Sequence, residues 1–183
     1  MDDLVRQAMA KWPHVPACYG WLGLDARGHW FMRDDEVQAQ GPFVQARGSR
    51  LRHDKLIGFI ERNYEPDEAG RWYFQNGPQR VYVELEATPW IARVQADGQV
   101  QAHTGPMFAA QQVQGALIDE DGHVALLLPG PRGPVPARVH SQDVVLLPDW
   151  LQAVGLDLQE MPAAQWPERF GYVSSPKAQP ACA

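Results

Sequence analysis

Cysteine is scarce in this sequence: Cys18 and Cys182 are the only two among 183 residues. Neither has a second cysteine or a histidine at metal-ligand spacing, so we expect no disulfide scaffold and no metal site. Long hydrophobic runs are also missing, because the longest, residues 124–128, is far shorter than the roughly 20 residues of a membrane helix. Residues 1–6 carry acids where a secretory signal peptide carries bases. We therefore expect a cytoplasmic protein that does not enter a membrane.

Hydroxyl side chains and catalytic motifs are also few. The sequence lacks the Gly-x-Ser-x-Gly turn of serine hydrolases, the Gly-rich phosphate-binding loops and the His-Glu-x-x-His helix of metalloproteases. All six serine and threonine residues lie outside any such motif: Ser49, Thr88, Thr104, Ser141, Ser174 and Ser175. We therefore assign no catalytic residue and no cofactor, and we favour a binding or regulatory function over an enzymatic one.

The apolar fraction of 45% is large enough for one substantial core or two smaller ones. The 16 basic and 22 acidic residues give the chain a net charge of −6. This overall charge opposes non-specific binding to nucleic acid or to an anionic membrane surface. A polyanionic partner would therefore need a local basic patch.

Two segments have the apolar spacing of helices that bury one face. In residues 2–12 the apolar side chains recur every three or four positions, and Pro13 ends the pattern. In residues 53–64, Leu56 and Ile60 fall on one face and the charged residues fall off it. The sequence therefore predicts an N-terminal helix and a second helix near 53–64.

Strand patterns dominate the rest of the chain. Aromatic and β-branched residues in 71–75 and 81–86 flank an Asn-Gly pair, which predicts a β-hairpin. Three stretches have the pattern Asp-x-x-Gly followed by apolar residues: 25–32, 67–74 and 119–126. They reflect either the turns that any β-meander needs or an internal duplication. We predict a β-rich α+β fold of antiparallel sheets or meanders, with repeated strand-turn-strand units covered by the two helices.

A change in amino-acid composition near residues 95–105 suggests two lobes. We predict an N-terminal α+β lobe at 1–98 and a C-terminal β-rich lobe at 99–160. Residues 161–183 are assigned to a C-terminal extension, which we expect to be partly disordered because its end has no apolar period.

The main charged feature is the run Arg-Gly-Ser-Arg-Leu-Arg-His-Asp-Lys at residues 47–55, which we call the basic segment. Positive charge near the start of a helix is unfavourable by roughly 0.3–1 kcal/mol per exposed charge, and a bound anion would relieve it. Free backbone N–H groups at a helix start and arginine side chains both bind phosphates and carboxylates. We therefore expect this segment to bind a small anion or an acidic protein partner. The candidate binding residues are Arg47, Arg50, Arg52, His53 and Lys55.

Three alternatives stay open at this point. The basic segment can be a solvated loop that nearby carboxylates, such as those of Asp34 and Asp54, neutralise. The protein can be an enzyme with a site between two lobes, where His53 or His140 acts with a carboxylate as general base. It can also be an oligomeric structural or assembly protein that associates through exposed aromatic side chains.

The stretches Lys-Trp-Pro-His-Val-Pro at 11–16 and Trp-Tyr-Phe-Gln-Asn-Gly-Pro at 72–78, with the residues that follow each, resemble a family of uncharacterised proteobacterial proteins of similar length. More distantly, the order Gly-x-Trp-Phe, Leu-Ile-x-Phe-Ile, Trp-Tyr-Phe, Val-Tyr-Val-Glu-Leu-Glu and Pro-Trp-Ile is similar to a second bacterial family of unknown function. That second resemblance implies a β-rich, two-lobe fold built from repeated motifs and a role in signal transduction. Neither family brings an established catalytic residue, so no site is carried over.

Overall fold

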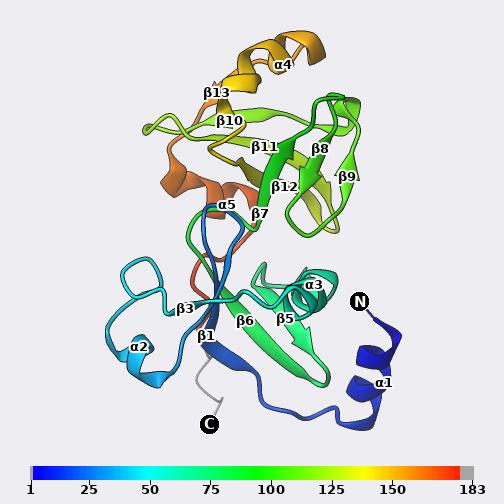
Figure 1. The fold of residues 1–183 in the computed structure, drawn as a ribbon, viewed down its shortest axis with the longest axis vertical. Coiled ribbons are helices and arrows are strands. Elements are labelled where there is room, and N and C mark those ends of the chain that lie inside the picture. Colours follow the sequence, from blue (N-terminus) through cyan, green and yellow to red (C-terminus); the bar gives the residue numbers. More distant parts are fainter. Residues whose placement is uncertain (1, 178–183) are drawn as a thin grey trace. The chain divides into compact units, whose positions relative to one another are not determined.

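The computed structural model describes residues 2–177, which form five α-helices and thirteen β-strands arranged in two mixed sheets (Figure 1). The β-rich α+β fold class predicted from the sequence is confirmed. The described residues divide into two compact units. The first comprises residues 2–25, 29–86 and 173–177, and the second comprises residues 26–28 and 87–172. No helix in this part of the chain is both long and apolar enough to cross a bilayer.

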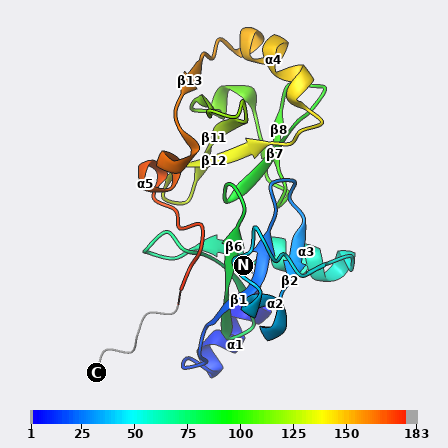
Figure 2. The ribbon, with the colours of Figure 1, turned by 90° about the vertical axis from the view of Figure 1, so that its left-hand side faces the viewer.

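The first unit contains a six-stranded sheet with the order β3-β2-β1-β6-β5-β4. Its strands are β1 (Cys18–Leu24), β2 (Trp30–Met32), β3 (Ser49–Arg50), β4 (Tyr64–Pro66), β5 (Trp72–Asn76) and β6 (Gln79–Leu85). Its helices are α1 (Asp3–Lys11), α2 (Asp35–Ala39) and α3 (Asp54–Arg62). The two predicted helices and the predicted hairpin are therefore confirmed. The sheet is mixed rather than purely antiparallel, because β1 and β6 run parallel side by side (Figure 1, Figure 2).

Helix α3 covers one face of this sheet through contacts between rings. Phe59 packs edge-to-face on Phe74 with the ring centroids 5.4 Å apart, and Trp30 packs in the same way on Tyr64 at 5.2 Å. The indole N–H of Trp30 also donates a hydrogen bond to Glu61 Oε1 at 3.4 Å. Phe59 thus joins the second half of the helix to β5, and Glu61 joins it to β2.

The opposite face of the sheet is closely packed at Gly23, the residue of β1 that pairs with Phe31. A Cβ atom on Gly23 would lie 2.3 Å from the ring of Phe43. That ring is only 2% exposed and packs edge-to-face on Phe31 with the centroids 5.9 Å apart. A side chain at position 23 therefore has no room.

Gly23→Ala is expected to lower the free energy of unfolding by about 1–3 kcal/mol, because the added methyl overpacks a buried ring. Urea-induced unfolding measures the change. Gly58→Ala in α3 is the matched control, since its Cβ would meet the flexible guanidinium of Arg62 at 3.3 Å and alanine is the better helix former. Equal stabilities of the two variants would contradict the packing argument.

Three turns use an aspartate in one common way. The carboxylates of Asp25, Asp67 and Asp119 each accept a hydrogen bond, at 2.7–2.9 Å, from the backbone N–H four residues later. The glycine three residues after each aspartate has a φ of 75–83°, in the left-handed region that favours glycine. The second carboxylate oxygen binds the side chain four residues on, at 2.8–3.1 Å: His29, Arg71 and His123. The Asp-x-x-Gly pattern is therefore explained by the geometry of a tight turn.

The second unit contains a seven-stranded sheet with the order β13-β10-β11-β12-β7-β8-β9. Its strands are β7 (Trp90–Val94), β8 (Val100–Ala102), β9 (Met107–Phe108), β10 (Ala116–Ile118), β11 (Val124–Gly130), β12 (Gly133–Val139) and β13 (Leu158–Glu160). Its helices are α4 (Leu147–Val154) and α5 (Trp166–Phe170), and α5 packs near β12 (Figure 2). This sheet is also mixed, because β12 pairs in parallel with β7 and β10 with β13.

The two units differ in extent from the predicted lobes. The predicted boundary at 98/99 falls in the turn of the β7–β8 hairpin, whereas the chain leaves the first unit after residue 86. Residues 161–172 of the predicted extension belong to the second unit and include α5 and the buried Tyr172, whose hydroxyl donates to Ala87 O at 3.2 Å. Residues 178–183, where disorder was expected, lie outside the described residues.

Candidate functional site

The basic segment connects the edge of the first sheet to α3. It includes β3, which pairs with β2, and it ends in the first turn of α3. All five of its candidate binding residues are exposed: Arg47, Arg50, Arg52, His53 and Lys55. The structure gives these residues different surroundings.

Arg47 already has an anionic partner. Its guanidinium forms an ion pair with the carboxylate of Glu86, which follows the end of β6 and lies 39 residues away in sequence. A carboxylate ligand at Arg47 would have to displace Glu86. Arg47 therefore contributes less to anion binding than the sequence suggested.

The strand register turns Arg50 away from α3. In the β2–β3 pair, Phe31 lies opposite Arg50 and Met32 lies opposite Ser49. Directly opposed residues in a sheet point to the same face, and successive residues point to opposite faces. Arg50 therefore lies on the same face of the sheet as Phe31 and Phe43, whereas Met32 lies on the opposite face.

His53 is the N-cap residue of α3. Its Nδ1 accepts a hydrogen bond from the backbone N–H of Leu56 at 3.2 Å. Accepting this bond requires an unprotonated Nδ1, so the proton of the neutral ring is on Nε2. The imidazole thus occupies one of the helix N–H groups that a bound anion would otherwise use.

Arg52 and Lys55 are the remaining cations of the segment. Neither forms an ion pair anywhere in the part of the chain that the structure describes, residues 2–177. Both are exposed, and one carboxylate, that of Asp54, lies between them in sequence. At the start of α3, the basic segment therefore offers Arg52 and Lys55 to an external anion.

An apolar groove lies against the same segment. This cavity of about 270 Å³ is bounded by Trp21, Met32, Leu51 and Leu56 at its rim, and by side chains of α3, β5 and β6. Trp21, Met32 and Leu56 are exposed to 41%, 48% and 36% of their surface. Leu51 and Leu56 bracket Arg52 and Lys55 in sequence, so the segment that carries the cations also forms one wall of the groove.

Sequence reasoning missed this groove. Trp21 and its neighbour Leu22 both line it, although successive strand residues normally face opposite sides. The pairing of β1 with β6 shifts register between Cys18 and Leu22, and such an irregularity re-aims side chains. The only sequence signal for it was Gly20, which adopts a φ of 78° immediately before Trp21.

Each histidine named for the alternative enzyme site, His53 or His140, takes part in a local hydrogen bond. His53 belongs to the first unit and serves as a helix cap, whereas His140 belongs to the second unit and its Nδ1 accepts a hydrogen bond from the Gln142 N–H at 3.2 Å. The carboxylate of Asp143 is bound by the Arg93 guanidinium, with Oδ2 2.6 Å from Nε and Oδ1 3.1 Å from Nη2. The buried Asp143 is therefore the partner of Arg93, an exposed residue of β7.

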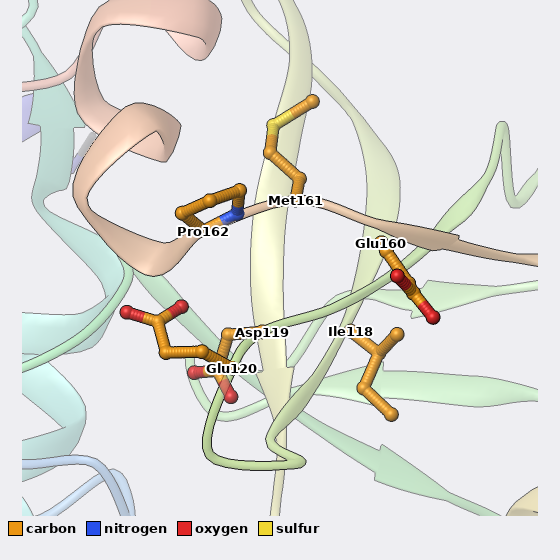
Figure 3. A pocket seen from close by; sticks show the side chains of 6 residues that line it. All are labelled: Ile118, Asp119, Glu120, Glu160, Met161 and Pro162. Atoms are coloured by element: carbon orange, nitrogen blue, oxygen red, sulfur yellow. The ribbon is translucent and has the colours of Figure 1, made fainter.

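A second cavity, of about 350 Å³, lies in the second unit and is lined by several carboxylates (Figure 3). Asp119 Oδ1 accepts a hydrogen bond from the His123 N–H within its own turn, and Glu120 Oε2 accepts one from the Ala163 N–H at 2.8 Å. Figure 3 shows the carboxyl groups of Glu120 and Glu160 at opposite ends of the cavity. Within residues 2–177 no group of three or more His, Cys, Asp or Glu residues is placed to hold a metal ion. Asp119 and Glu120 therefore serve local structure.

Comparison with known proteins agrees with the resemblance seen in the sequence. The model of the family described as "Protein of unknown function (DUF2946)" matches residues 1–177. A DUF1285 family protein from Silicibacter pomeroyi DSS-3 is 14% identical over 81% of this chain and 84% of that chain, with a TM-score of 0.48. A DUF1285 family protein from Shewanella baltica OS155 is 14% identical over 75% and 97%, with a TM-score of 0.45. No curated protein matches the chain.

Proposed function

We propose that the first unit of this chain, which belongs to the family of proteins of unknown function DUF2946, is a binding module. Its partner bears carboxylate or phosphate groups. Arg52 and Lys55 are the residues that recognise the anionic groups. The sequence grouped Arg47 and Arg50 with them. Arg47 instead pairs with Glu86, and Arg50 faces the other side of the sheet.

One observation carries this proposal. Two exposed cations stand at the start of a nine-residue helix, without an ion pair among the described residues, in a chain whose net charge is −6. Positive charge at this end of a helix is unfavourable, and an external anion relieves it. The net negative charge of the chain opposes anion binding at places without a local group of cations.

Reversing both charges, as Arg52→Glu with Lys55→Glu, is expected to weaken binding of a fluorescently labelled ten-residue polyglutamate peptide by about tenfold or more. Fluorescence anisotropy at low salt measures the affinity, and added salt should weaken binding to the wild-type protein. The fold should survive, because both side chains are exposed and because glutamate at position 55 is favourable in the first turn of α3.

The control carries the same change of net charge elsewhere. Arg132→Glu with Arg169→Glu alters two exposed residues of the second unit and should leave the affinity within about twofold of the wild-type value. The proposal fails when both double variants weaken binding equally, or when the wild-type protein does not bind the peptide at low salt.

A further inference from the structure

We propose that the partner is an acidic peptide segment whose apolar side chains occupy the apolar groove while its carboxylates pair with Arg52 and Lys55. This inference rests on the proposed function and names the chemistry of the partner. A free inorganic anion would use the two cations and leave the apolar surface of the groove in water.

The rim of the groove exposes unusually large apolar side chains for a protein surface. Trp21, Met32 and Leu56 come from β1, β2 and α3, and each keeps more than a third of its surface exposed. Scattered apolar residues are common on surfaces, but three that line one cavity form a contiguous patch. Burial of this patch against apolar side chains would provide the free energy that charge pairing alone does not.

Charge complementarity identifies the sign of the partner. Arg52 and Lys55 lie between the two groove residues Leu51 and Leu56 in sequence, so the segment that carries these cations also forms part of the groove wall. A partner that fills the groove therefore places its neighbouring residues beside these cations. Acidic residues next to apolar ones satisfy both surfaces at once.

The size and the polar residues of the groove favour a peptide. Its volume of about 270 Å³ is smaller than the roughly 300–1,000 Å³ of cofactor and drug-sized pockets, and it suits a few side chains. The exposed amide of Asn76 lines one end and offers both a donor and an acceptor. A peptide backbone can use both groups, whereas an acyl chain can use neither.

The experiment compares two labelled twelve-residue peptides by fluorescence anisotropy. One alternates glutamate with leucine and phenylalanine, and the other has serine in place of every leucine and phenylalanine. The wild-type protein should bind the first peptide about tenfold more tightly than the second. Trp21→Ser with Leu56→Ser should remove this difference and leave the weaker, salt-dependent binding of the serine peptide unchanged.

The charge-reversed variant, Arg52→Glu with Lys55→Glu, should weaken the binding of both peptides. If the groove variant does not fold by circular dichroism, Met32→Gln replaces it, because this half-exposed side chain lies on a rim and not in the core. Equal affinities of the wild-type protein for the two peptides would overturn the groove inference and leave the proposed function standing. If the wild-type protein binds neither peptide, both the groove inference and the proposed function are overturned. If it binds phosphatidylserine vesicles but neither peptide, the partner is a membrane surface instead of a peptide.

Discussion

Arg33→Ala is expected to lower the free energy of unfolding by about 3–5 kcal/mol, because it would leave three buried or partly buried carbonyl groups without this hydrogen-bond donor. Arg33 is only 3% exposed. Its guanidinium donates to Ala46 O at 2.8 Å, to Gly41 O at 2.5 Å and to Gly20 O at 3.3 Å. These bonds tie the chain between α2 and β3 to β1, and that chain leads into the basic segment.

Urea-induced unfolding measures the loss, and Arg33→Lys separates charge from geometry. A lysine ammonium carries its donors on one atom, so it cannot reach the three carbonyls that the planar guanidinium spans. The lysine variant should therefore recover only part of the lost stability. A free energy of unfolding for Arg33→Ala within about 0.5 kcal/mol of the wild-type value would show that the three hydrogen bonds do not hold this part of the chain.

Asp67→Asn is expected to lower the free energy of unfolding by about 2–4 kcal/mol at pH 7, because Asp67 is the centre of a nearly buried network. Its Oδ2 accepts hydrogen bonds from the Arg71 Nε at 2.8 Å and from the Tyr82 hydroxyl at 2.9 Å, and its Oδ1 binds two backbone N–H groups. Arg71 also lies over the Tyr82 ring, 4.8 Å from its centroid. An asparagine cannot accept all of these bonds and would leave the guanidinium without its counter-charge.

The loss of unfolding free energy in Asp67→Asn should become smaller as the pH falls. Burial raises the pKa of Asp67, but the hydrogen bonds from Arg71 and Tyr82 outweigh it and hold the pKa below its ordinary value. A carboxyl whose pKa is lower in the folded state stabilises the protein above its unfolded pKa, about 3.9. The stabilisation is then lost as the pH falls through the folded pKa. The difference between wild type and Asp67→Asn should therefore shrink below about pH 4.

Unfolding curves at pH 7, 5, 4 and 3 test both parts of this expectation. The matched control is Asp34→Asn, because Asp34 is an exposed N-cap whose oxygen accepts the Val37 N–H at 2.9 Å, and asparagine caps helices equally well. A loss at Asp67→Asn that stays constant from pH 7 to pH 3 would contradict a role for the ionised carboxylate.

Local patterns in the sequence were sufficient for the elements that carry the candidate site. The apolar spacing of Leu56 and Ile60 predicted α3, and the Asn-Gly pair predicted the β5–β6 hairpin. These signals arise from the repeat of 3.6 residues in a helix and of two in a strand, and from the backbone needs of tight turns. They do not depend on the rest of the chain, so they can be recognised before the fold is known.

The grouping of the site residues could not be recognised in this way. Arg47 is paired with Glu86, 39 residues away, only because β3 and β6 belong to one sheet. Arg50 lies opposite Phe31 in the β2–β3 pair, whereas its neighbour Leu51 follows β3 and lines the groove. The sequence of residues 47–55 contains neither fact, because nothing in a charge pattern records strand order or register.

The sequence by itself determined that the chain is a β-rich α+β protein, that a helix lies near residues 53–64, and that basic residues gather around its start. Tertiary structure alone decided which cations stay available and that an apolar groove adjoins them. The physical reason is that helix and turn geometry are set by neighbours in sequence. The groove is set by the parallel pairing of β1 with β6 and by the irregular register that brings Trp21 to its rim.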